Sequence, residues 1–216
     1  MKQALTKCNW LIRKASPSDW PDIAEICCLT ADSGHPIDRD RWKFFQQIWI
    51  SPYQRFCPDW SYVAELDGRV VGYLTGCAAT VKFKTRRRQF DLILAFKIIS
   101  GRFGWDADVK RFLKRALGLE KSGEQIFGSP FNRKIWNEYP AHLHMNFRAE
   151  ARSGGGGRAL LERYFLDLKL AKVRGVHLFC GVRPVVFYSK MGFEEKGRAE
   201  MRPLMDVFAL GRMITD

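Results

Sequence analysis

Four consecutive glycines, Gly154, Gly155, Gly156 and Gly157, lie in the segment "ARSGGGGRALLERYF", directly before residues with the pattern of a strong helix. Glycine is poorly suited to lead into a helix, because it loses the most backbone freedom when it is ordered. It is useful where backbone N–H groups at a helix N-terminus must approach an anion without interference from side chains. Arg158 adds positive charge in the first helical turn. The segment therefore predicts a site for a phosphate-bearing ligand.

Two well-known phosphate-binding patterns do not fit these residues. The P-loop requires Lys followed by Ser or Thr after its last glycine, and Arg158–Ala159 does not supply that pair. The dinucleotide fingerprint matches by letter at Gly154, Gly156 and Ala159. However, it requires an acidic residue at the end of the next strand, and "VHLFCGV" has none. A third pattern fits better: Gln or Arg, two residues, Gly, one residue, then Gly or Ala, with Arg152 as its first residue.

A strand that precedes the glycines carries polar side chains on one face. In "AHLHMNF" (residues 141–147), His142, His144 and Asn146 alternate and therefore point to the same side of the sheet. Histidine titrates near neutral pH, so His144 is a candidate general base and His142 and Asn146 are candidate substrate ligands. Structural histidines are the alternative. Two histidines without a placed third ligand make an incomplete metal site, so we predict none.

Patterns of helix and strand place these residues in a fold. "NWLIRKA" (residues 9–15) predicts a first strand. The next segment predicts a helix, because Ser16 and Asp19 form a capping-box pattern with Pro17 at the first helical position. "SYVAELDGRVVGYLTG" predicts a hairpin with its turn at Asp67–Gly68.

The second half of the chain repeats strand and helix patterns around the glycines. The helix after them has apolar residues on one face and Gly175 as its expected cap, and "VHLFCGV" predicts the next strand. "VVFYSKMGF" predicts a short helix and turn, and "VFALGRMI" a closing strand. With no repeat or linker, we expect residues 1–216 to form a single domain.

Residues 82–136 set the charge of the chain. They hold 14 of the 36 Lys and Arg residues but only 5 of the 23 Asp and Glu residues, and the whole chain has a net charge of +13. We expect residues 82–137 to form helices that make up an insertion or lid. Its basic face is either solvated or in contact with nucleic acid or a membrane surface, although no nucleic-acid motif is present. Such a lid would favour a neutral or acidic substrate over a polyamine.

The cysteines and the lengths of the apolar runs indicate the cellular compartment. The six cysteines lie mostly in apolar segments without a CxxC pair, and the first residues show no export signal. No apolar run reaches the roughly 18 residues that a membrane span requires. We therefore expect a cytoplasmic protein with reduced cysteines.

The chain resembles the GNAT N-acetyltransferases over nearly its whole length. The resemblance includes "LIRKASPSD", the hairpin "VAELDGRVVGYL", the glycine loop and "FYSKMGF". More narrowly, "TADSG", "SPYQRFCPDWSYVAE" and "YPAHLHMNF" are similar to the acetyltransferase-like domain of O-GlcNAcases and its free-standing bacterial relatives. The resemblance implies an α/β fold with a mixed sheet, the GNAT acyl-CoA acyltransferase fold, with the basic helical insertion between the third and fourth strands.

The resemblance also implies acetyl-CoA as the cofactor and a role for particular residues. Tyr188 would protonate the departing CoA thiolate, or hydrogen-bond its sulfur, because the reference pKa of a phenol lies above that of a thiol. Asp32 becomes a candidate substrate contact. The cofactor would be held by Phe147, Arg152, Ser153, Gly154, Gly155, Gly156, Gly157, Arg158 and Phe187.

Several residues depart from the family pattern. Asn146 replaces an aspartate of the narrower group, and Gly181 stands where many members carry an asparagine that supports the thiolate end of the cofactor. In several members the base lies at positions that correspond, counted without gaps, to Leu143 and Ala141. The two histidines would then face the opposite side unless a bulge intervened.

Two functions follow as expectations. The first is acetyl transfer from acetyl-CoA to a primary amine of a small molecule or protein. The alternative is an acetyl-CoA-binding pseudo-enzyme or sensor that engages a partner through its basic face. The acceptor and the oligomeric state are not specified by these patterns.

Overall fold

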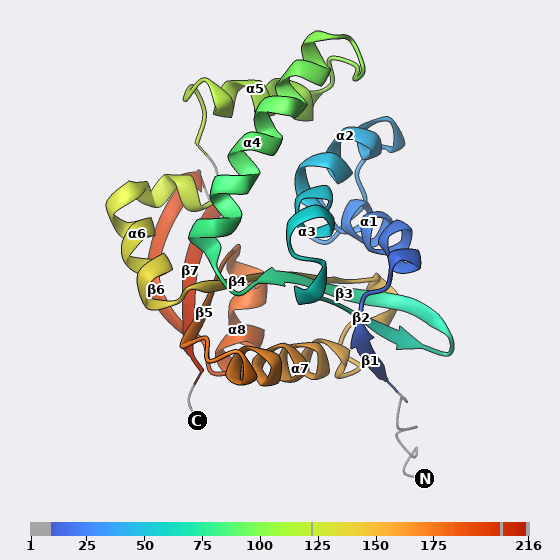
Figure 1. Ribbon diagram of the computed structural model, residues 1–216, viewed down its shortest axis with the longest axis vertical. Helices are drawn as coiled ribbons and strands as arrows, with labels where there is room; N and C mark the ends of the chain where they lie inside the picture. The colour runs from blue at the N-terminus through green and yellow to red at the C-terminus, as the bar shows by residue number, and fades with distance from the viewer. Residues whose placement is uncertain (1–9, 122, 204, 215–216) are drawn as a thin grey trace.

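The computed structural model describes residues 10–121, 123–203 and 205–214. In this part of the chain seven strands form one mixed sheet in the order β1-β2-β3-β4-β5-β7-β6 (Figure 1). The strands are β1 (Leu11–Lys14), β2 (Ser61–Leu66), β3 (Arg69–Cys77), β4 (Ala141–Phe147), β5 (Gly175–Cys180), β6 (Glu194–Arg202) and β7 (Met205–Met213).

Helices cover both faces of the sheet. Those before the insertion are α1 (Trp20–Leu29), α2 (Arg39–Trp49) and α3 (Ser51–Phe56). Those between β3 and β4 are α4 (Thr80–Ile99), α5 (Ala107–Ala116) and α6 (Gly128–Glu138). The last two are α7 (Gly156–Leu170), which follows the glycines, and α8 (Val182–Lys190). Figure 1 shows α7 on one side of the sheet and α1 to α4 on the other.

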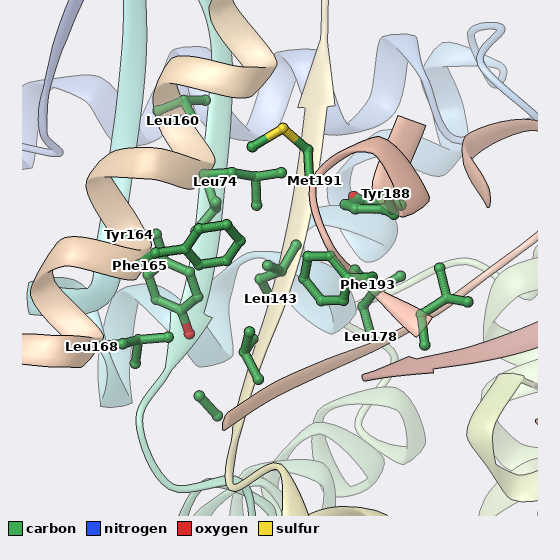
Figure 2. Close-up of a cluster of buried hydrophobic side chains, with 14 of the residues drawn as sticks. Leu74, Leu143, Leu160, Tyr164, Phe165, Leu168, Leu178, Tyr188, Met191 and Phe193 are labelled. Carbon is green, nitrogen blue, oxygen red and sulfur yellow. The ribbon is translucent and has the colours of Figure 1, made fainter. Parts of the chain in front are cut away.

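The sheet separates two apolar cores. Under α7, Leu160, Tyr164 and Leu168 pack against β4 and β5, where Leu143 and Leu178 are buried (Figure 2). On the opposite face one cluster joins α1 and α3 to β2 and β3, and another joins α2, α4 and α5. The division follows from the alternation of side chains along each strand.

The two central parallel strands pair over a very short stretch. The register of β4 with β5 is Ala141 to Val176 and His142 to His177. By contrast, β4 pairs with β3 along its whole length, and β5 with β7 along its own. Beyond His142, therefore, β4 has a hydrogen-bonded neighbour on one side only.

Most sequence expectations for the elements are confirmed. The hairpin turns at Asp67–Gly68, the strand over residues 141–147 is β4, and the basic insertion between the third and fourth strands is helical. One expectation is wrong: α7 ends before Lys172, which takes the left-handed conformation, whereas Gly175 opens β5. Gly175 is a glycine because a Cβ there would lie 2.9 Å from the ring of Tyr139.

Three elements were not expected from sequence. Helices α2 and α3 form separate short segments around Ser51–Pro52. Strand β6 has the charged sequence "EEKGRAEMR" and pairs only with β7, at the edge of the sheet. An edge strand with much of its surface in solvent does not need the apolar alternation by which strands are recognised.

The packing of Gly72 in β3 generates a prediction about stability. A Cβ at this position would overlap the ring of Phe147 on β4. We expect Gly72→Ala to lower the free energy of unfolding by about 1–3 kcal/mol, because the ring must leave its place in a packed site. Gly104→Ala is the control, since a Cβ there meets no atom within 4 Å. Equal unfolding midpoints in urea for the two variants would contradict the prediction.

Candidate functional site

The glycine loop presents unpaired backbone N–H groups at the start of α7. Ser153 and Gly155 have φ of 68° and 89°, and Gly155 is the N-cap residue without a capping side chain. Within the described residues, no backbone carbonyl accepts a hydrogen bond from the amides of residues 153–157, and the first such bond is from Ala159 to Gly155. The side chain of Arg158 is exposed and pairs with Glu162. Unpaired amides at a helix N-terminus, with positive charge nearby, are the features that favour binding of an anion.

Trp10 holds this loop in place. Its indole Nε1 donates a hydrogen bond to the carbonyl of Gly154 at 2.5 Å. A Cβ at Gly154 or Gly156 would lie 2.8 Å from the indole ring, and one at Gly156 also 2.9 Å from the ring of Phe147. Two of the four glycines are therefore required for close packing, whereas Gly155 is required for its positive φ. The loop is a packed structure and not a flexible tract.

A second segment is tied to the loop by Arg152 and to α8 by Arg183. Arg152 donates to the carbonyl of Gly34 at 2.9 Å and to that of Phe147 at 3.3 Å. Arg183 on α8 donates to the carbonyl of Ser33 at 3.2 Å. The turn between α1 and α2, which also contains the exposed Asp32, thus lies beside the glycine loop.

The opening between β4 and β5 exposes backbone polar groups next to this loop. The amide of Arg148 donates to Val71 on β3, so the alternate residues Met145 and Phe147 direct their N–H and C=O groups toward β5. Since the two strands pair only as far as His142, these groups face a gap. The side chain of Phe147 packs under α7, and its carbonyl accepts from Arg152.

Tyr188 lies on α8, across the gap from β4. It is buried among apolar residues, and no hydrogen bond to its hydroxyl is present within the described part of the chain (Figure 2). Burial raises the pKa of this phenol, so the hydroxyl retains its proton. Its neighbour Phe187 packs toward Gly157 at the start of α7. Gly181 has ordinary extended backbone, and a Cβ there would meet nothing within 4 Å.

His144 and Asn146 lie together on the face of β4 that points away from α7. Nδ1 of His144 lies 3.3 Å from the hydroxyl of Tyr73, and the amide of Asn146 donates to that hydroxyl at 3.0 Å. The same amide lies 3.3 Å from Nε2 of His144. The NH2 group of Asn146 can only donate, so in this arrangement Nε2 is the acceptor and Nδ1 carries the proton of a neutral ring. The exposed Trp49 of α2 stacks on this imidazole at 5.8 Å.

His142 is engaged within the fold. Its Nε2 lies 2.9 Å from the hydroxyl of Tyr53, and its Nδ1 lies 2.8 Å from Oγ1 of Thr80 and 3.1 Å from Sγ of Cys77. Both ring nitrogens of His142 therefore have partners within the fold. No group of three or more His, Cys, Asp or Glu in the described residues is arranged to hold a metal ion.

The register of β4 puts the two candidate histidines on the opposite face from the positions where family members carry the base. Strand β4 pairs with β3 without a shift, so Ala141 and Leu143 lie under α7. The histidines face the side of α1 to α4, as the count without a bulge predicts. The sequence analysis did not identify Trp10, Trp49 or Tyr73, which have no recognisable motif and reach the site from three separate elements.

Three buried imidazoles generate a prediction about pH. Desolvation lowers the pKa of His144 and His177 to about 4 and that of His142 well below its usual value. In the unfolded chain the histidine side chains titrate near pH 6.5. Between about pH 6.5 and 4 the unfolded state therefore binds more protons, and the free energy of unfolding falls as the pH falls. Each histidine contributes up to about 1.4 kcal/mol per pH unit.

We expect His144→Gln to flatten this pH dependence, because it removes one of the three groups. The exposed His35 provides the matched control, His35→Gln, which should leave the slope as in the wild type. Urea unfolding at several pH values across the window measures the slope. If both variants behave like the wild type, His144 is protonated to the same extent in the folded and unfolded states.

Comparison with solved structures places the fold. The chain matches no protein-family model. It is similar to a protein named SsHAT, with 25% sequence identity, a TM-score of 0.73, and coverage of 96% of this chain and 99% of that one. Ard1 from Thermoplasma volcanium is 14% identical, with a TM-score of 0.56 over 96% of this chain and 99% of its own.

A third similar structure, yncA from Salmonella typhimurium, was solved with its cofactor acetyl-CoA. It is 12% identical, with a TM-score of 0.54 over 96% of this chain and 95% of its own. The chain therefore has the GNAT acyltransferase fold.

Proposed function

We propose that the protein transfers the acetyl group of acetyl-CoA to a primary amine. The observation that carries the proposal is the glycine loop with unpaired N–H groups, set at the edge of the gap between β4 and β5. The cofactor solved with yncA, which has the same fold, supports the choice of donor.

The loop fits a pyrophosphate. Its free amides, the N-terminus of α7 and the guanidinium groups of Arg152 and Arg158 all favour negative charge. The loop surface beside Gly155 is open, since a Cβ there has a single neighbour, at 3.9 Å. In contrast, Gly154 and Gly156 have no room for a side chain, so a ligand would approach from the side of Ser153 and Gly155.

The gap fits an extended chain that carries amides. The N–H and C=O groups of Met145 and Phe147 are placed like those of a strand that lacks its neighbour, so an amide-containing arm can pair with them. When bound, acetyl-CoA supplies an acetyl group activated as a thioester. A free N–H from β4 would stabilise negative charge on the carbonyl oxygen as the amine attacks.

Tyr188 is suited to protonate the leaving sulfur. Its hydroxyl holds its proton because burial raises the pKa, and it has no described hydrogen-bond partner to compete with the ligand. As the new C–N bond forms, the amine gives a proton to solvent, and as the C–S bond breaks, Tyr188 gives its proton to the sulfur and regains one from solvent. Phe187 and Tyr188 stand on the same helix, so packing of the first against the loop positions the second.

The amine would approach from the side of α1 to α4. There His144 and Asn146 are polar side chains of β4, and the indole of Trp49 stacks on His144. The low pKa of His144 keeps the ring unprotonated, as a base requires, but also makes it a weak base. The acceptor amine should therefore reach the site already neutral, and an orienting hydrogen bond is the main role we propose for His144.

Substitution at Gly155 tests the cofactor site. Gly155→Glu places a carboxylate in the anion-binding loop, and we expect micromolar acetyl-CoA binding to be lost because like charges repel. Isothermal titration calorimetry on the folded variant measures it. Gly68→Glu is a matched control, since Gly68 also has a positive φ, of 75°, and open surroundings, but lies in the β2–β3 hairpin.

The two variants share the backbone strain of a side chain at positive φ. Any difference in acetyl-CoA binding between them therefore depends on where the added carboxylate stands. If Gly155→Glu binds acetyl-CoA as well as Gly68→Glu does, the loop does not hold the pyrophosphate. If the folded wild type does not bind acetyl-CoA, the proposed function is wrong.

Substitution of Tyr188 tests the transfer step. We expect Tyr188→Phe to keep its acetyl-CoA affinity and to lower kcat for thiol release at least about 100-fold, because only the proton donor is removed. A panel of primary amines with a thiol reagent gives the rates. Unchanged turnover would remove Tyr188 from the mechanism. Tight binding without transfer to any amine would instead favour the sensor function.

A further inference from the structure

Helix α4 is apolar on two opposite faces. Its inner face packs Phe90, Leu94 and Ile98 against α2 and α5. Its outer face, defined here as Leu92, Phe96 and Ile99, points away from that core: these side chains are 73%, 71% and 77% exposed. The spacing of four and seven residues puts the three on one stripe of the helix. An apolar stripe on a helix is normally buried against a partner, and the outer stripe of α4 is not.

The outer face lies on a part of the molecule that projects from the sheet. Figure 1 shows α4 extending away from β3 and carrying α5 at its far end. The segments that follow α4 add further exposed apolar residues, Trp105, Leu117 and Leu119. Single exposed apolar residues are ordinary, but several large ones in one projecting unit indicate an interaction surface.

The charge of this unit selects an anionic partner. Of the 14 Lys and Arg residues between positions 82 and 136, only four pair with a carboxylate in the described residues: Lys84, Arg87, Arg111 and Arg115. Ten cations therefore lack an ion pair there. Of the five acidic residues, four are in ion pairs and Asp106 caps α5.

One cation lies on the same stripe as the exposed apolar groups. Arg88 stands four residues before Leu92 and Val81 seven before Arg88, so both continue the line of the outer face. Val81 is 56% exposed, and Arg88 is exposed as well. Long basic side chains beside such residues can lay their stems on apolar surface and reach outward with their charge.

We propose that the outer face of α4 docks the protein on the surface of an anionic phospholipid bilayer. Leu92, Phe96 and Ile99 would enter the boundary of the acyl chains, and the surplus cations would contact the phosphate groups. No helix among the described residues has the length and apolarity to cross a membrane, so the helix lies in the interface.

Other occupants fit the charge or the apolar stripe, but not both. A second copy would bring the same surplus of cations against itself, which costs electrostatic free energy. Nucleic acid would pair with the cations and stack on aromatic groups, but has no apolar region to receive Leu92 and Ile99. A bilayer with acidic headgroups offers both.

Co-sedimentation of the full chain with vesicles tests the proposal. We expect binding to phosphatidylcholine vesicles that contain phosphatidylglycerol, weaker binding at higher salt, and none to phosphatidylcholine alone. Leu92→Asp should weaken binding at least about tenfold through lost apolar burial. Arg88→Gln should weaken it about fivefold through one lost charge.

Leu170→Asp is the matched control, because Leu170 is also 73% exposed but lies at the end of α7, on the other side of the sheet. It should bind like the wild type. Thermal unfolding of each variant confirms that it is folded, and acetyl-CoA binding should be the same in all of them.

Each other outcome overturns the proposal. Equal losses in Leu92→Asp and Leu170→Asp would mean that any added carboxylate repels the vesicles. An absence of vesicle binding would exclude a lipid surface, and a wild-type dimer disrupted by Leu92→Asp would then assign the face to a second copy. Salt-sensitive binding to duplex DNA or RNA that Leu92→Asp leaves unchanged, without vesicle binding, would assign the cations to nucleic acid.

Discussion

The separation of β4 from β5 is the constraint on which the rest of this structure depends. The two parallel strands pair at Ala141–Val176 and His142–His177 and then diverge. A strand that loses its neighbour inside a sheet leaves backbone donors and acceptors without partners, which is costly unless something else satisfies them. Near the closed end Tyr164 of α7 bridges β3 and β4, because its hydroxyl lies 2.9–3.0 Å from the carbonyls of Cys77 and His142. The open end is left to solvent or a ligand.

Strand β4 serves two chemical environments because its side chains alternate. Leu143, Met145 and Phe147 pack under α7, and Phe147 also supports the glycine loop through contact with Gly156. His142, His144 and Asn146 face α1 to α4 and are neutral polar groups in a buried setting. A shift of one residue would exchange the two sets, so the unbroken pairing with β3 determines which side carries the polar groups.

The pairing of charged groups differs between the region of the glycine loop and the helical insertion. Around the glycine loop, Arg152 and Arg183 donate to carbonyls of the neighbouring turn, so part of their donor capacity is used within the fold. Arg148 is buried and pairs with Glu25. The helical insertion is different: its few carboxylates are already paired or capping, and its remaining cations have no counter-charge among the described residues. The net positive charge is thus unevenly distributed over the surface of the chain.

The sequence by itself determined the elements with strong local signals. The Asp67–Gly68 hairpin, strand β4 and the helix after the glycines follow from turn chemistry and side-chain periodicity, which act over a few residues. The motif around Arg152 and Tyr188 also indicated the family. Tertiary structure alone decided that Trp10 packs on Gly154 and Gly156, that Trp49 stacks on His144, and that the outer face of α4 is left exposed among the described residues. The two contacts join residues 95 to 146 positions apart, and the exposure depends on the rest of the fold, so the pattern of a short segment carries no information on either.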